Sequence, residues 1–371
     1  MKSYDEFMDY VKENVTDYLP ERFENAQIRI QQVTKNNDVV LDALTIIDPA
    51  SRLSPNIYLN PMYEQYKDGK DLDEMVAKIA DAYVENMAPD FARGFDVSVD
   101  DFTKYEKIKD HIFPRVANLE RNSKRLETVP YTQKEDLAIT YHIKVASDGE
   151  GVGSVMITNY LMEQYGVSKE ELHKVAIGNM ERLSPTVFTP LKEIMMDIMA
   201  GDIARDEGIS PEEAREYAED DIPTEGPELY CLTNEEKING AVYIMNEDIQ
   251  KMVAERVGGD FFILPSSVHE VLIMGKDEEI SVQELRNMVQ FVNGSCVSPD
   301  EVLSDQVYEY DAKAHKFSIC APEKELKQEK AMGMGMGMNP EPAFVMEDRG
   351  MYHTNQPEQK HEPMRHSARG R

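Results

Sequence analysis

The chain has 371 residues, and 40 Lys and Arg against 70 Asp and Glu give it a formal net charge of −30 at pH 7. This charge repels phosphate backbones, so we expect no direct binding of nucleic acid through a basic surface. No run of about 18 apolar residues occurs, and residues 1–6 contain no apolar signal core, which argues against a membrane-spanning helix. The composition therefore predicts a soluble, acidic, cytoplasmic protein.

The cysteines indicate a reducing compartment. Only Cys231, Cys296 and Cys320 occur, none of them in a C-x-x-C pair, and an odd number cannot close a complete disulfide framework. We expect each to pack as a small apolar side chain.

Metal and nucleotide motifs are incomplete. His269-Glu270 lacks the second histidine of H-E-x-x-H, because Ile273 occupies its place, so we expect no metal site. The glycines at 149, 151 and 153 lack the remaining features of a dinucleotide-binding loop, and a hairpin turn explains them. The sequence predicts no cofactor.

Residues 1–128 read as an N-terminal α+β unit. Ser3-x-x-Glu6 is a capping box that predicts a helix, and alternation predicts strands at 26–34 and 39–47 with a short one at 57–59. Asp71 caps a further amphipathic helix. We expect another helical region over residues 99–125, interrupted by Pro114.

Residues 129–322 read as a second α+β unit. Ser168, Ser210 and Ser281 each precede a helix with an acidic residue three positions later. We expect strands at 137–146, 154–158, 229–232 and 240–244. A helix ended by Gly258-Gly259 should follow, and then a strand pair around residues 265–270. A short helix opened by Ser298 and a hairpin over 307–320 should close the unit.

Short connections between hairpins and helices favour an α+β fold with antiparallel sheets over a doubly wound parallel sheet. Residues 323–371 differ in composition, with alternating Met and Gly from Met332 to Met338. That segment has too little apolar surface to offset its ordering entropy, so we expect a disordered tail.

Candidate catalytic residues lie between the two strands around residues 265–270. In an extended segment Ser267 and His269 share one face, while Ser266 and Glu270 lie on or near the other. Ser267 as nucleophile, His269 as base and Glu270 as acid would resemble a hydrolase, although no G-x-S-x-G elbow is present. The alternative interpretation is structural, with the serines satisfying backbone groups and His269 anchoring a loop.

Asparagines provide candidate binding positions. Asn234 and Asn239 flank a charged turn, where asparagine also serves as a turn former. If both converge with His269 at one sheet edge, a small polar pocket forms there. Asn159 and Ser266 complete the set of candidate binding residues.

Three segments carry a resemblance to a known family. They are Ile157-Thr158-Asn159 with the helix from Ser168 to Asn179, Leu229–Asn234 with Gly240-Ala241, and Phe262–Glu270. Together they resemble an uncharacterised bacterial domain-of-unknown-function family (family 5688) of anaerobic gut bacteria. The resemblance covers most of residues 1–320 and implies a bacterial cytoplasmic protein; it implies no activity.

Three functions remain open from the sequence. The leading hypothesis is a protein-interaction module without catalytic activity, which binds a partner, possibly a basic protein, at a sheet edge. The second is a hydrolase that uses Ser267 and His269. The third is an acidic inhibitor that mimics DNA. The sequence gives no oligomeric state.

Overall fold

The computed structural model describes residues 1–48, 54, 56–86, 101–148, 151–222, 226–276 and 280–321. Three antiparallel sheets with surrounding helices form an α+β fold, which confirms the predicted class. The segment predicted to be a disordered tail, 323–371, lies outside the described residues.

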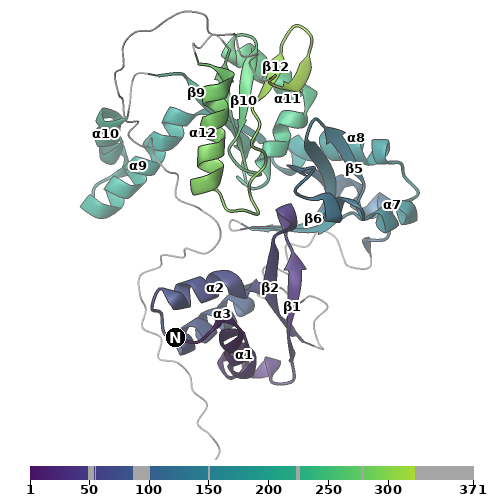
Figure 1. Cartoon of the computed structure of the whole chain (residues 1–371), viewed down its shortest axis with the longest axis vertical. Coiled ribbons are helices and arrows are strands. Elements are labelled where there is room, and N and C mark those ends of the chain that lie inside the picture. Colours follow the sequence, from purple (N-terminus) through teal and green to yellow (C-terminus); the bar gives the residue numbers. More distant parts are fainter. Residues whose placement is uncertain are drawn as a thin grey trace, which may run out of the picture.

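The first sheet has the strand order β1-β2-β3, and helices cover one of its faces (Figure 1). Phe7, Leu44, Ile79 and Tyr83 are among the buried residues between helices and sheet. Its elements are α1 (Tyr4–Asn14), η1 (Val15–Tyr18), η2 (Glu21–Phe23), β1 (Gln27–Thr34), η3 (Asn36–Asp38), β2 (Val40–Ile47), β3 (Asn56–Tyr58), α2 (Leu59–Lys67) and α3 (Leu72–Asn86).

The second sheet has the order β4-β6-β5, with β7 also paired to β6. It contains strands from both sides of residue 128, and a domain boundary at that residue stays a prediction. The elements of this region are α5 (Tyr105–Ile108), η5 (Lys109–His111), β4 (Ile112–Asn118), α6 (Ser123–Leu126), β5 (Tyr131–Lys134), β6 (Leu137–Asp148), β7 (Gly151–Met156), α7 (Asn159–Tyr165) and α8 (Lys169–Leu183).

The helix predicted over residues 99–125 is wrong for its central part. Residues 112–118 form β4, whose register places Pro114 opposite Tyr141 on β6. Ile112, Pro114 and Val116 are buried in alternation, which is the two-residue period of a strand. Residues 99 and 100 lie outside the described residues.

The third sheet has the order β13-β12-β10-β11-β9-β8. Its strands and the associated helices are β8 (Thr186–Pro190), α9 (Leu191–Glu207), α10 (Pro211–Asp221), β9 (Leu229–Asn234), η6 (Gly240–Met245), α11 (Glu247–Val257), β10 (Phe261–Pro265), β11 (Val271–Gly275), α12 (Val282–Ser295), β12 (Tyr308–Asp311) and β13 (Lys316–Ile319). The predicted closing hairpin and the strand pair around residues 265–270 are confirmed.

Two predictions in this region are wrong. Residues 240–244 form the 3₁₀ helix η6 rather than a strand, and every residue of η6 is buried. A fully apolar run of this length does not distinguish a buried strand from a buried helix. Ser298 opens a turn and not a helix, and its hydroxyl donates to Asp300 Oδ1 at 2.6 Å.

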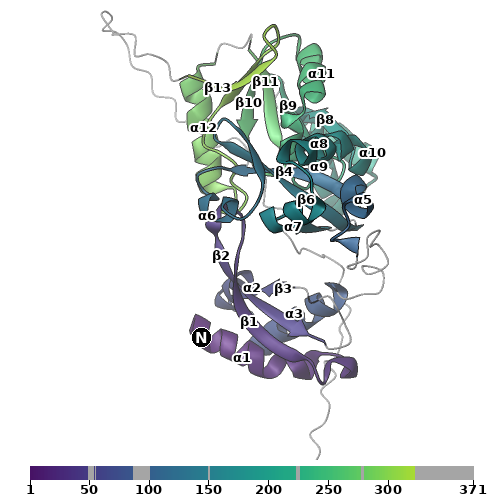
Figure 2. The same ribbon diagram turned by 90° about the vertical axis from the view of Figure 1, so that its right-hand side faces the viewer.

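The second and third sheets share one hydrophobic core. Tyr141 and Ile143 of β6 belong to the same buried cluster as Val242 of η6 and Phe261 of β10. Figure 2 shows β4 and β6 beside the strands of the third sheet. These two sheets therefore form one body, in which η6 lies at the contact.

The hairpin of β1 and β2 connects the first sheet to this body (Figure 2). At its tip, Asn37 adopts the left-handed conformation, with φ of 58°. Its Nδ2 donates to Pro299 O at 2.9 Å and Val302 O at 2.7 Å, and its N–H donates to Asn122 Oδ1 at 2.9 Å. Asparagine tolerates this backbone conformation, so one residue both turns the chain and docks the tip.

The helices are of moderate length, and α9, with 17 residues, contains several acidic residues. Within the described ranges, no helix combines the length and apolarity needed to cross a bilayer.

Candidate functional site

The candidate site surrounds the five-residue connection between β10 and β11. Ser267 Oγ donates to Glu270 Oε1 at 3.0 Å and accepts from His269 N–H at 2.9 Å. Ser267 N–H also donates to Glu270 O at 3.3 Å. Only 7 % of Ser267 is exposed, so its hydroxyl lies within the turn and its hydrogen bonds stabilise the turn.

The imidazole of His269 lies between two other loops. Its Nδ1 accepts from Asn239 N–H at 3.2 Å, and its Nε2 lies 3.2 Å from Glu301 Oε1. Because Nδ1 acts as an acceptor, the neutral ring has its proton on Nε2 and donates it to Glu301. Among the described side chains the ring has no hydrogen bond to Ser267, so a nucleophile–base pair is not formed in this arrangement.

Opposing effects act on the pKa of His269. Burial lowers it, whereas the hydrogen bond and charge of Glu301, together with the charge of Glu270, raise it by more. The net pKa of His269 is therefore raised. Protonation would place a hydrogen on Nδ1, facing Asn239 N–H, and would break that contact.

The loop after β9 holds Asn239 in place. The side chain of Asn234 accepts from Ile238 N–H at 3.2 Å and donates to Ile238 O at 3.0 Å, which closes the loop. Asn239 has φ of 55°. The next residue, Gly240, has no space for a side chain, because a Cβ atom there would lie 2.6 Å from His269 O.

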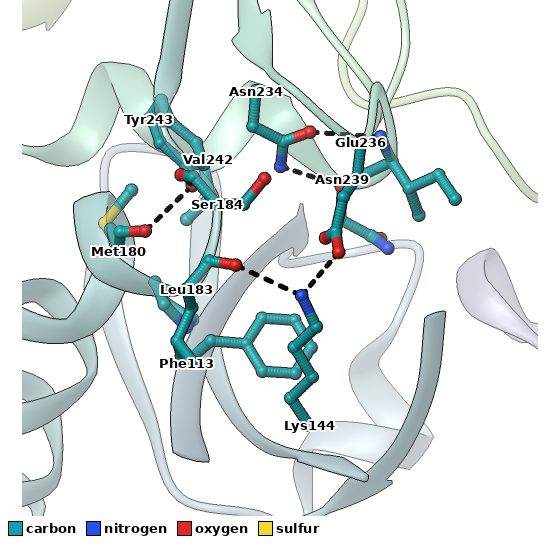
Figure 3. A pocket seen from close by; sticks show the side chains of 12 residues that line it. Phe113, Lys144, Met180, Leu183, Ser184, Asn234, Glu236, Asn239, Val242 and Tyr243 are labelled. Carbon is teal, nitrogen blue, oxygen red and sulfur yellow. Dashed lines mark hydrogen bonds and ion pairs between the residues drawn. The ribbon is translucent and has the colours of Figure 1, made fainter. Parts of the chain in front are cut away.

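A small hollow lies beside this loop, between β4, β6, α8 and η6 (Figure 3). Lys144 reaches across it to pair with Glu236 and donates to Leu183 O at 3.1 Å. Tyr243 donates its hydroxyl to Ser184 O, whereas Ser184 Oγ is buried without a hydrogen-bond partner. The cavity volume is about 20 Å³, which suits a water molecule and not an organic substrate.

The structure brings together part of the predicted site. Asn234 and Asn239 line the hollow, and Asn239 touches His269, so the three residues lie together beside the ends of the interior strands β9 and β10. Thr233 Oγ1 also donates to His269 O at 2.8 Å. His269 is not among the residues that line the hollow, so the small polar pocket expected from these three residues stays a prediction.

The other candidates have different surroundings. Asn159 begins α7, where its N–H donates to Thr128 O at 2.9 Å and its side chain donates to Glu127 O at 3.3 Å. Ser266 is half-buried at the end of β10. Glu270 lies near Cys231, and burial, followed by this charge, raises the pKa of the Cys231 thiol to about 12.

Several contributing residues have no local sequence signal. Glu301 follows His269 by 32 residues, and Lys144 and Glu236 are 92 residues apart. The contact of Lys144 with Glu236 depends on the packing of the second sheet against the third, whereas the contact of His269 with Glu301 joins two loops of the third sheet. Within the part of the chain that the structure describes, no group of three or more His, Cys, Asp or Glu side chains is arranged to hold a metal ion.

Comparison with known proteins gives one match. The model of a family of unknown function (DUF5688) matches residues 4–312. No curated protein and no solved structure matches the chain. The match covers all three sheets up to β12 and assigns no activity.

Proposed function

The chain belongs to this family of unknown function, and from that premise we propose that it is a protein-interaction module whose partner docks on the outer face of α12. The supporting observation is an exposed apolar surface on this helix. Met288 is 49 % exposed, Phe291 66 % and Val292 37 %. Residues three and four apart lie on one side of a helix, so the three form one patch, which we call the α12 face.

The α12 face also has no formal charge. Residues 287–299 contain no Asp, Glu, Lys or Arg, in a chain where these types make up 30 % of all residues. Interface cores are depleted of charge and enriched in Met and aromatic side chains. Leu285 and Val289 on the inner side pack into the third sheet's core, so the outer side chains are not needed for folding.

Charge indicates the type of partner. The net charge of −30 repels a second copy of the same chain, which disfavours self-association, and attracts a basic protein. We therefore propose a partner protein with an apolar segment flanked by Lys or Arg. The apolar contact would supply affinity and the surrounding charges would speed association.

The alternative of a Ser/His hydrolase requires a rearrangement. Ser267 Oγ would have to leave Glu270, become accessible and reach the imidazole of His269. A DNA-mimicking inhibitor would use acidic surfaces in place of the α12 face, so its binding would be salt-sensitive and independent of Phe291.

The proposal includes a cytoplasmic setting in a bacterium. Cys231, Cys296 and Cys320 are free thiols, which supports a reducing compartment. The resemblance to bacterial sequences supports the source.

The test is an affinity capture from native lysate with three forms of the full chain. We expect the wild type to capture a basic protein, and Met288→Gln/Phe291→Gln to lose it while unfolding at an unchanged temperature. Tyr217→Gln is the matched control, because Tyr217 is 58 % exposed on α10, away from the α12 face. Equal capture by all three forms would contradict the proposal. An esterase or peptidase activity lost in Ser267→Ala would favour the hydrolase.

A further inference from the structure

The described part of the chain ends beside α12, the helix that carries the α12 face. Cys320, which follows β13, is buried in one cluster with Leu285 on the inner side of α12. Arg286 of the same helix donates from Nη2 to Cys320 O at 3.2 Å. The last described residue, Ala321, is exposed. Residues 322–371 therefore continue from a point next to α12.

This continuation contains an apolar segment without formal charge. Residues 331–340, which we call the Met/Gly segment, contain no Asp, Glu, Lys or Arg. The methionines of the segment are Met332, Met334, Met336 and Met338. At every second position of an extended backbone, side chains lie on one side, and the glycines between them let the backbone come close to a surface. Methionine adapts to irregular apolar surfaces and makes favourable sulfur contacts with aromatic rings, such as that of Phe291 on the α12 face.

The Met/Gly segment is within reach of all of α12. Eleven residues, 322–332, lead from Ala321 to the first methionine of the segment. Fully extended, they span roughly 36 Å. The 14 residues of α12 give it a length of about 21 Å, and a helix with its side chains is about 10–12 Å wide. The connection is longer than either dimension, so chain length does not prevent contact with the outer side of the helix.

Charge favours this segment over a second copy of the chain as the occupant of the α12 face. Residues 323–371 contain eight Lys or Arg and eight Asp or Glu, so they are neutral, and the net charge of −30 lies on residues 1–322. A second copy would bring the same negative charge against this surface, and the two would repel each other. The Met/Gly segment brings no charge and is already tethered beside the helix.

We propose that the Met/Gly segment folds back onto the α12 face of its own chain and competes with the partner for it. A tethered segment acts at an effective concentration on the order of 1 mM. A contact with a dissociation constant of about 0.1 mM would then cover the face in roughly nine molecules of ten, and would weaken the apparent affinity for the partner about tenfold. The inference rests on the proposed function, because it adds regulation to the same face.

The test uses tryptophan fluorescence, because the chain contains no Trp of its own. Phe291→Trp in the full chain places a single fluorophore on the α12 face. Tyr217→Trp is the matched control, because Tyr217 is exposed on α10, away from this face. Each is also made in the four-serine variant, which carries Met332→Ser, Met334→Ser, Met336→Ser and Met338→Ser. Unchanged unfolding temperatures verify that all forms are folded.

We expect the four serines to uncover the Trp at position 291. Its acrylamide quenching constant should rise several-fold and its emission should move to longer wavelength, because apolar side chains no longer exclude water from the indole. The Trp at position 217 should not respond. The values for position 291 should not depend on protein concentration, because the contact forms within one chain.

A second measurement separates this inference from partner docking. At limiting bait in native lysate, the four-serine variant should capture up to about tenfold more partner than the wild type. Fluorescence requires no partner, so a covered face without any captured protein would contradict the proposed docking while supporting the contact with the Met/Gly segment. Capture through the α12 face with unchanged quenching at position 291 would leave the docking intact and overturn the contact.

Three further results would overturn the inference. The first is an equal response of the Trp at positions 217 and 291 to the four serines. The second is quenching at position 291 that depends on protein concentration, which would identify a second copy as the occupant. The third is equal capture of the partner by the wild type and the four-serine variant.

Discussion

His269 Nε2 lies 3.2 Å from Glu301 Oε1, although 32 residues separate them in the chain. The main chain follows the same connection, because Val268 N–H donates to Glu301 O at 2.9 Å. The loop that holds Glu301 also receives the hairpin tip, through the bond from Asn36 Nδ2 to Asp300 O at 2.9 Å. This loop therefore links the connection between β10 and β11 to the first sheet.

The His269–Glu301 contact predicts a pH-dependent stability. Since the folded-state pKa of His269 is raised, its stabilisation is complete below the unfolded value of about 6.5 and is lost as pH rises through the folded value. Glu301→Gln should remove this dependence. Urea unfolding at about pH 6 and about pH 8 measures this dependence. Between these two pH values, the free energy of unfolding of the wild type should fall by up to about 1 kcal/mol more than that of the variant.

Glu255→Gln is the control for that comparison, because Glu255 is exposed and should leave the dependence as in the wild type. A steeper pH dependence in Glu301→Gln than in the wild type would refute the assigned direction.

Ser267→Ala should destabilise the fold by about 1–3 kcal/mol, because it leaves the His269 N–H and the Glu270 carboxylate without their bonds to Oγ. Ser266→Ala is the matched control and should change the unfolding free energy by less than about 0.5 kcal/mol. Chemical denaturation provides both values. Equal effects in the two variants would show that the Ser267 hydroxyl does not hold the turn.

Gly240→Ala tests the close approach of η6 to the connection between β10 and β11. A Cβ atom would lie 2.3 Å from Thr233 Oγ1 and 2.6 Å from the main-chain oxygen of His269. We expect the free energy of unfolding to fall by about 2–3 kcal/mol or more. Gly178→Ala, on α8 with nothing within 4 Å of its Cβ position, should stabilise by up to about 1 kcal/mol. A similar effect of both substitutions would contradict the packing described around Gly240.

Asn37→Gly keeps the left-handed turn and removes the side-chain bonds to Pro299 and Val302. The bonds from Asn36 Nδ2 to Asp300 O and from the main-chain N–H of residue 37 to Asn122 remain, so the contact of the first sheet with the body should weaken, and small-angle scattering should report a larger radius of gyration. Gln31→Ala, exposed on β1, should scatter as the wild type does. An unchanged radius in Asn37→Gly would mean that other contacts hold the two parts together.

Local signals in the sequence predicted many of the elements. Ser3, Ser168, Ser210 and Ser281 cap the expected helices through hydrogen bonds to the residue three positions on. The sequence did not predict the strand at residues 112–118. Pro114 disfavours a regular strand, and its partner on β6, Tyr141, lies 27 residues further along the chain.

The site was predictable only in part. Asn234 and Asn239 were candidates because they flank a charged turn, and His269 was a candidate as the base for Ser267. Glu301 and Lys144 belong to ordinary surface-forming types, and their partial burial follows from the packing of the loops and sheets around them. The exposed face of α12 also required the structure, since its apolar residues fit a core equally well in sequence.

The most direct measurement of the central claim is site-specific photocrosslinking with a benzophenone side chain at position 291 or 217, in native lysate. We predict a discrete crosslinked species with a basic protein from position 291 and none from position 217, insensitive to catalytic inhibitors. Crosslinking from position 217 alone, or from neither position while the chain still captures its partner, would contradict docking on the α12 face.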